Sequence, residues 1–377
     1  MTLPPAEYFA GDERAKALGM LQILAPDGAA STDQVDVDRP LAERLLRQMM
    51  LVRIADERLM ALQRQGTISF YGEARGQEAT VVGTAAALGK DDWIVPALRE
   101  AGVGLYVGHP LSQYVAQVFG NANDRTHGRQ MPCHPCDGER HYVVMSSCVA
   151  NQLPQAVGIA MAMRIAGDAG RVCLGYMGDG GTSEADFHVA MNFAGVFKPP
   201  CVLVCQNNQW AISTPGTLQT ASETIAIKGL AYGVESLRFD GNDVLAALVA
   251  TRYAVEKARR GDGPTFLEGL TYRVGAHTSS DDPSRYRDET VTLSWRNERD
   301  PLRRFSLWLR GRGWLDDAAE KRLAEEIEAE VRAVIAAEEP APPPDLRTMV
   351  TDVYEEVPWH LEEQFRALSD GKESSHG

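Results

Sequence analysis

Apolar residues recur at helical spacing in the first part of the chain. Between residues 41 and 63 they include Leu45, Met49, Val52 and Leu59, which predicts a long amphipathic helix. Further helices are predicted at residues 77–88, 151–165, 183–196, 251–259 and 323–335.

Short apolar runs between the helices predict strands, at residues 93–95, 171–177, 201–206 and 265–274. The second and third runs flank the helix at 183–196, so the three segments form a βαβ unit with parallel strands. The predicted fold is therefore α/β, with a doubly wound, mainly parallel sheet flanked by helices.

Three parts are expected along the chain. Residues 1–40 are mixed in composition with little periodicity, and form an extended N-terminal arm. Residues 41–338 form the α/β domain and its C-terminal helices. Residues 339–377 begin with a Pro-rich linker, and apolar residues such as Tyr354 and Trp359 indicate that this tail docks on a partner.

Composition narrows the class of protein. The 377 residues are 44% hydrophobic and 24% charged, which is typical of a soluble globular protein. The net charge of −14 argues against a nucleic-acid binder, and no apolar run is long enough to span a membrane. The first ten residues lack an apolar signal core, and the six cysteines are too sparse for a disulfide framework, so we expect a cytoplasmic protein.

A glycine-rich turn follows the strand at 171–177 and carries Asp179, and the next strand leads to Asn208. Parallel strands of a βαβ unit end at the same edge of the sheet, where ligands of open α/β sheets bind. A carboxylate and an amide oxygen there suit Mg²⁺, which usually also binds phosphates. The alternative is a tight turn with a capping aspartate and an unrelated Asn-Asn turn.

Three glycines of this turn, Gly178, Gly180 and Gly181, let a ligand approach the backbone closely. The helix that follows offers free N–H groups and a positive dipole end to a diphosphate. The segment therefore predicts a site for Mg²⁺ and a diphosphate.

The same segment resembles the thiamine-diphosphate motif, in which Gly-Asp-Gly is followed at a set spacing by Asn-Asn. From about Leu41 to Trp359 the chain is similar to the alpha subunits of thiamine-diphosphate-dependent 2-oxo-acid dehydrogenases, and the tail 352–358 resembles the branched-chain type. The other matching stretches are 64–71, 99–102, 128–132, 152–158, 211–215, 240–244 and 271–273.

The resemblance implies a thiamine-diphosphate-binding fold and a set of site residues. It implies that Asp179, Asn208 and the carbonyl of Trp210 bind Mg²⁺, and that His277 lies at the cofactor and is needed for acyl transfer. It gives Arg99 a contact with the diphosphate and places Ser147 and Ala211 beside the cofactor. A monovalent-cation site, for K⁺, would fall on Ser146, Cys148, Asn151 and Gln152.

The implied reaction is oxidative decarboxylation of a branched-chain 2-oxo acid of the 3-methyl-2-oxobutanoate type. The acyl group passes to the lipoyl group of an acyltransferase partner. In this family the glutamate that activates the cofactor belongs to the beta subunit, so we expect an α2β2 assembly and no activity from this chain alone.

Departures from the family pattern lie near the expected substrate pocket. Ala97 and Leu98 precede Arg99 where a tyrosine is common, and Cys148 and Val149 replace Pro-Leu. The loss of a hydroxyl group and the gain of apolar bulk at these positions are expected to alter the preference for the acyl chain of the substrate. Gln206 also stands where an arginine is common.

Other interpretations stay open. The same chemistry could act on pyruvate or acetoin. Cys133 and Cys136 form a Cys-x-x-Cys pair that could bind zinc or act in redox chemistry, although no second pair appears. A non-catalytic scaffold subunit is a further alternative. The residues 278–280 after His277 occupy a position where some relatives are phosphorylated, but a solvated polar loop is the favoured explanation for them.

Overall fold

A computed structural model describes residues 5–32, 35–168 and 170–373. Residues 1–4 and 33–34 of the predicted arm and 374–377 of the predicted tail lie outside the described residues. Five parallel strands form the main sheet, in the order β1-β2-β3-β7-β6. These strands are β1 (Trp93–Val95), β2 (Cys173–Gly178), β3 (Cys201–Asn207), β6 (Glu235–Asp240) and β7 (Thr265–Leu270). A small antiparallel pair is formed by β4 (Trp210–Ala211) and β5 (Thr214–Pro215).

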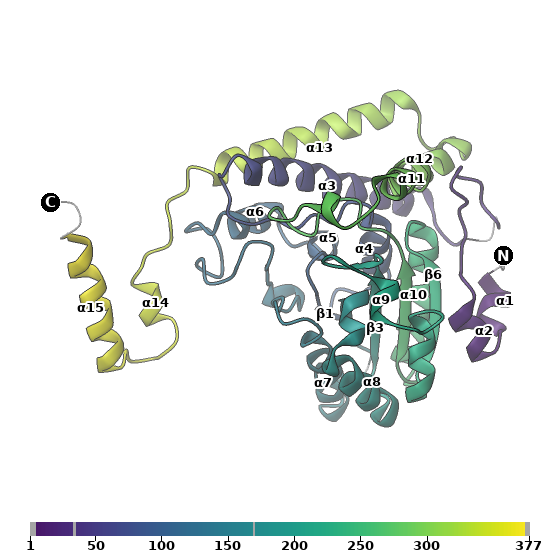
Figure 1. Ribbon diagram of the computed structural model, residues 1–377, viewed down its shortest axis with the longest axis horizontal. Coiled ribbons are helices and arrows are strands. Elements are labelled where there is room, and N and C mark those ends of the chain that lie inside the picture. The colour runs from purple at the N-terminus through teal and green to yellow at the C-terminus, as the bar shows by residue number, and fades with distance from the viewer. Residues whose placement is uncertain (1–4, 33–34, 169, 374–377) are drawn as a thin grey trace.

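Helices cover both faces of the sheet (Figure 1). The α-helices are α1 (Pro5–Ala10), α2 (Glu13–Leu18), α3 (Arg39–Arg64), α4 (Glu78–Ala85), α5 (Ala101–Tyr106), α6 (Leu111–Phe119), α7 (Gln152–Ile165), α8 (Ala185–Phe197), α9 (Gly216–Gln219), α10 (Val244–Arg259), α11 (Glu289–Glu298), α12 (Pro301–Gly311), α13 (Asp317–Glu338), α14 (Thr348–Thr351) and α15 (Trp359–Glu373). The 3-10 turns are η1 (Gly138–Arg140), η2 (Asp179–Ser183), η3 (Ala226–Tyr232) and η4 (Pro283–Arg285).

Alternate residues of the central strands enter two different cores. Cys201 and Leu203 of β3 pack with α7 and α8, whereas Val202 and Val204 pack with α4 and α10. Because both faces are buried, the strands are continuously apolar rather than alternating. The prediction of a parallel α/β sheet flanked by helices is confirmed.

Several predicted boundaries need correction. The strand predicted at residues 265–274 ends at Leu270. The helix expected from residue 183 begins at Ala185, because η2 takes up the glycine-rich turn first. Strand β6 was not predicted, because its sequence Glu-Ser-Leu-Arg-Phe-Asp contains charged residues. In the folded chain the N-terminal arm covers these charges.

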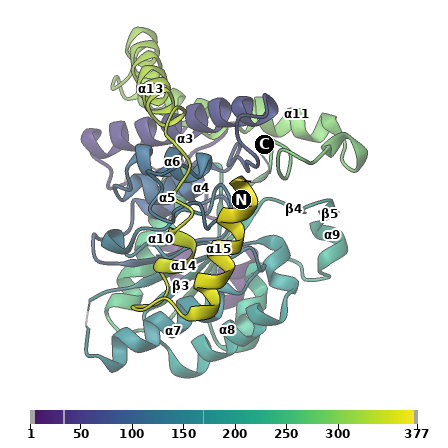
Figure 2. The same ribbon diagram turned by 90° about the vertical axis from the view of Figure 1, so that its left-hand side faces the viewer.

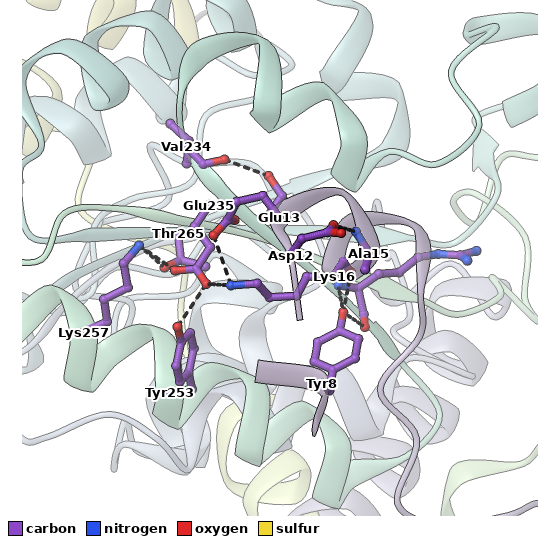
Figure 3. A network of polar contacts seen from close by, with 12 residues as sticks. Tyr8, Asp12, Glu13, Ala15, Lys16, Val234, Glu235, Tyr253, Lys257 and Thr265 are labelled. Atoms are coloured by element: carbon purple, nitrogen blue, oxygen red, sulfur yellow. Dashed lines mark hydrogen bonds and ion pairs between the residues drawn. The ribbon is translucent and has the colours of Figure 1, made fainter. Parts of the chain in front are cut away.

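The N-terminal segment packs on β6 and α10 through a polar network (Figure 3). Glu235 accepts hydrogen bonds from Lys16 Nζ at 2.6 Å and from Tyr253 Oη at 2.9 Å. Lys257 Nζ lies 2.9 Å from the other carboxylate oxygen of Glu235. Tyr8 is buried and its hydroxyl donates to the carbonyl of Arg238. Residues 5–18 are two short helices in this structure, so this stretch of the expected arm is not extended.

The C-terminal segment contrasts with the arm. Helices α14 and α15 stand clear of the body in Figure 1 and face the viewer in Figure 2. Contacts to the body include Asp352, which accepts hydrogen bonds from His127 and Arg129 at 2.7 and 2.8 Å. Trp359 is 78% exposed and Tyr354 50% exposed. Exposed aromatic residues of this kind are common at protein interfaces.

Candidate active site

The ends of β2 and β3 bring the two predicted polar residues to one edge of the sheet. Gly178 is paired in register with Gln206, so Asp179 and Asn208 follow directly at neighbouring strand ends. Both side chains are buried. The sequence spacing therefore produces the proximity that the βαβ argument requires.

A cavity of about 460 Å³ opens at this edge. Every residue predicted to contact the cofactor lines it, although they come from segments far apart in the sequence. These residues are Arg99, Ser147, Gly178, Asp179, Gly180, Gly181, Asn208, Trp210, Ala211 and His277.

The glycine-rich turn packs closely against the β4 segment. A Cβ atom on Gly180 would lie 2.5 Å from the Cβ of Ala211, so a larger residue would push the two segments apart. The turn that carries Asp179 is therefore held against Trp210 and Ala211 only while residue 180 is glycine.

Asp179 is a buried acid with a single side-chain donor. Gln219 Nε2 donates to its Oδ2 at 3.0 Å, and burial raises the pKa of the carboxyl to about 6. The Asn208 side-chain oxygen accepts from the Trp210 N–H at 3.2 Å, and the Trp210 carbonyl accepts from Arg273 at 3.4 Å.

The donor chemistry fits the implied groups. Asp179, Asn208 and the Trp210 carbonyl offer oxygen ligands, which suit a hard divalent cation. Buried side-chain atoms of Gln77, Gln152 and Gln206 lack hydrogen-bond partners among the described residues, and all three residues line the cavity. Such atoms are rare in folded proteins unless a ligand or water satisfies them.

Arg99 and His277 meet at another part of the cavity wall. Arg99 Nη2 donates to the His277 carbonyl at 2.6 Å and lies 3.4 Å from His277 Nδ1. Burial, followed by the charges of Arg99 and Arg273, lowers the pKa of His277 to about 4. The imidazole is therefore neutral at pH 7. Because a guanidinium only donates, Nδ1 is the acceptor and the ring proton belongs on Nε2.

A second histidine in the cavity was missed by the sequence analysis. His134 Nδ1 lies 3.0 Å from the Pro132 carbonyl, and Nε2 lies 2.8 Å from Ser147 Oγ. A carbonyl only accepts, so Nδ1 carries the proton and the Ser147 hydroxyl donates to Nε2. In the sequence, His134 stands out only as part of the Cys-x-x-Cys motif. That motif indicates zinc binding or redox chemistry instead.

Glu100 was also missed. Its Oε1 accepts from Gln206 Nε2, and its Oε2 accepts from the backbone N–H groups of Ala97 and Arg99 at 2.8 and 3.1 Å. Burial raises the pKa of Glu100 to about 7. The glutamine found in place of the usual arginine thus pairs with a buried acid.

The four residues of the expected monovalent-cation site lie along one turn, in which the Cys148 N–H donates to Ser146 Oγ and the Asn151 N–H donates to the Cys148 carbonyl, both at 3.2 Å. Ser146 and Gln152 line the cavity, whereas Cys148 and Asn151 are not among its lining residues. The Asn151 side-chain oxygen accepts from Gln155 at 2.7 Å.

The two cysteines of the Cys-x-x-Cys motif lack the environment of reactive thiols. Burial raises the pKa of Cys133 to about 12 and also raises that of Cys136. Reactive thiols have lowered pKa values. Within the described residues, no group of three His, Cys, Asp or Glu side chains could hold a metal ion.

The fold and cavity define an α/β enzyme whose site lies at the carboxyl edge of a parallel sheet. Residues 46–347 match the family model of the dehydrogenase E1 component, and the chain belongs to that family. Membership implies thiamine diphosphate as the cofactor, in agreement with the resemblance found from the sequence.

Relatives give the same result over most of the chain. The 2-oxoisovalerate dehydrogenase subunit alpha 2, mitochondrial, of Arabidopsis thaliana is 40% identical over 363 residues, covering 96% of this chain and 76% of the relative. The human 2-oxoisovalerate dehydrogenase subunit alpha, mitochondrial, is 40% identical over 326 residues, covering 86% and 73%.

Proposed function

We propose that this chain is the alpha subunit of a branched-chain 2-oxo-acid dehydrogenase. It catalyses oxidative decarboxylation of acids such as 3-methyl-2-oxobutanoate and acyl transfer to a lipoyl group. The observation that carries the proposal is the convergence of Asp179, Asn208, Arg99 and His277 in one cavity of a chain of this family.

Each residue of the cavity has a role derived from its surroundings. Thiamine diphosphate, when bound, supplies a carbon nucleophile and an electron sink for loss of carbon dioxide. Asp179, Asn208 and the Trp210 carbonyl would hold Mg²⁺, and the buried charge of Arg99 favours an anionic ligand. Neutral His277 holds a proton on Nε2, which suits donation of a hydrogen bond or a proton. A K⁺ ion on Ser146, Cys148, Asn151 and Gln152 remains part of the proposal.

Apolar side chains support a branched-chain substrate. The cavity is lined on several sides by Phe70, Leu98, Met131, Met145, Val149 and Ile212. An apolar surface of this extent favours an aliphatic acyl chain over the single methyl group of pyruvate.

The remaining parts of the assembly are also proposals. A beta subunit completes the cofactor site in an α2β2 heterotetramer, and a lipoyl acyltransferase takes the acyl group. The exposed apolar residues of the tail support a partner there. No helix within the described ranges is long and apolar enough to cross a membrane. The cytoplasmic location stays a prediction, while the relatives are described as mitochondrial.

Substrate preference tests the proposal. The chain is co-expressed with its beta partner and assayed with 3-methyl-2-oxobutanoate, pyruvate and acetoin. We expect kcat/KM for the branched acid to exceed that for pyruvate by at least about tenfold. A preference for pyruvate or acetoin would transfer the proposal to that alternative, and no turnover of any of the three compounds would reject it.

A further inference from the structure

Asp56 is a buried acid on α3. It does not line the cavity, so the roles of the cavity residues do not explain it. It is 7% exposed, and burial raises the pKa of its carboxyl to about 8. A buried acid on an otherwise apolar helix face costs free energy, so a leucine of similar size would favour stability more. Asp56 therefore calls for a reason beyond helix packing.

Both carboxyl oxygens of Asp56 contact one short segment, residues 71–76, which we term the strap. The Tyr71 hydroxyl donates to Oδ1 at 2.7 Å, and the Ala74 N–H donates to Oδ2 at 2.7 Å. The Tyr71 hydroxyl also lies 3.0 Å from that of Tyr114. These buried contacts fix the strap at two points.

The other side of the strap contacts the residues of the cavity wall. The Glu73 carbonyl accepts a hydrogen bond from Arg99 Nη1. The Tyr71 carbonyl accepts from the Ser279 N–H at 3.0 Å, and the Tyr71 N–H donates to Ser279 Oγ at 3.3 Å. The strap thus holds both Arg99 and residues 277–281, which we term the His277 loop.

The strap also contacts the segment that leads into the His277 loop. A Cβ atom on Gly275 would lie 1.6 Å from Glu73 Oε1, so the segment leading into the His277 loop touches the strap directly. Arg99 Nη2 also donates to the His277 carbonyl. Asp56, the strap, Arg99 and the His277 loop therefore form one connected set of contacts.

We propose that Asp56 is a positioning residue, which fixes Arg99 and the His277 loop at the cavity wall by holding the strap through Tyr71 and Ala74. The inference rests on the proposed function where it gives the cavity wall a role in catalysis. The contacts of Asp56 with the strap do not depend on that function. The variant Asp56→Asn keeps the size of the side chain and replaces one acceptor oxygen by an NH2 group, so it cannot accept from both Tyr71 and Ala74; the comparison is made at pH 9, where the wild-type carboxyl is ionised.

The test measures amide hydrogen exchange of residues 276–287 in the full chain, with and without thiamine diphosphate and Mg²⁺. We expect Asp56→Asn to speed exchange in this segment at least about tenfold, as the loss of one buried hydrogen bond allows. The matched control is Asp243→Asn, which removes another buried acid that accepts from the N–H groups of Ile23 and Leu24 at 2.7 and 2.6 Å. The control should lower the melting temperature without changing exchange in 276–287.

Exchange at the wild-type rate in folded Asp56→Asn would overturn the proposal and leave Asp56 a structural role only. Should this variant fail to fold, Tyr71→Phe removes one hydroxyl from the same contacts, and unchanged exchange there would overturn the proposal equally. Exchange in the unliganded chain does not depend on catalysis. Faster exchange in a complex that decarboxylates no 2-oxo acid would therefore reject the proposed function and leave this inference standing.

Discussion

Two walls of the same cavity are built in different ways. Asp179 and Asn208 follow directly from hydrogen-bonded neighbouring strands, so local sequence and sheet register place them. Arg99, His134 and His277 lie in segments between regular elements and are placed by contacts with other segments, such as those with Ser147 and the strap. The strand wall is therefore positioned by the sheet itself, whereas the loop wall is positioned only while the contacts between its segments are made.

The sharpest test of the strand wall is removal of the Asp179 charge. We expect Asp179→Asn to weaken Mg²⁺-dependent binding of thiamine diphosphate by at least roughly 100-fold, or about 2.7 kcal/mol, because a neutral amide replaces a carboxylate ligand. Isothermal titration calorimetry measures this affinity, and Asp168→Asn, on the partly exposed Asp168–Arg171 ion pair, is the control. Equal affinities for the two variants would contradict the role of Asp179.

The loop wall should show the opposite pattern of effects. His277→Asn should reduce turnover of the complete enzyme by roughly 100-fold, as expected for loss of a group that transfers a proton. Cofactor affinity should change by less than about threefold, since His277 supplies no metal ligand. A variant that loses cofactor affinity and turnover together would remove the distinction between the two walls.

Acid should weaken the binding of Mg²⁺ at the strand wall. Burial raises the pKa of Asp179 to about 6 in the folded chain, above the ordinary value of 3.8 for an aspartate, so the stability it contributes to the free protein is present below pH 4 and is lost as pH rises through 6. Mg²⁺ must displace that proton, so its affinity should fall up to about tenfold per pH unit below pH 6.

Melting temperatures with and without Mg²⁺ and thiamine diphosphate, from pH 5 to 8, check this expectation. The stabilisation by ligand should grow with pH in the wild type and stay flat in Asp179→Asn. Other buried acids change the melting temperature of the wild type and of Asp179→Asn alike, so they do not affect this comparison. Ligand stabilisation that does not vary with pH in the wild type would contradict the assignment.

Substrate preference should change least. Leu98→Tyr adds bulk and a hydroxyl to the apolar part of the loop wall, so kcat/KM for 3-methyl-2-oxobutanoate relative to pyruvate should fall by roughly three- to tenfold. Steady-state kinetics on both acids measure the ratio. A ratio unchanged by this substitution would show that Leu98 does not contact the acyl chain.

The contrast between the strand wall and the loop wall also explains which features could be predicted from the sequence. Apolar runs and the glycine-rich turn gave the parallel βαβ unit, and therefore the neighbouring positions of Asp179 and Asn208. Arg99 and His277 came from the family resemblance. His134 and Asp56 carry no local signal, because their roles depend on contacts with Ser147 and Tyr71 that form only in the folded chain. Strand β6 was missed because its charged residues pair with distant residues such as Lys16.

The central claim is that this chain carries part of a thiamine-diphosphate site that a beta subunit completes. The most direct measurement is release of carbon dioxide from 3-methyl-2-oxobutanoate, with saturating thiamine diphosphate and Mg²⁺ and an artificial electron acceptor. The purified chain alone should give no rate above background, and addition of the beta chain should restore turnover. Robust turnover by the chain alone would contradict the claim.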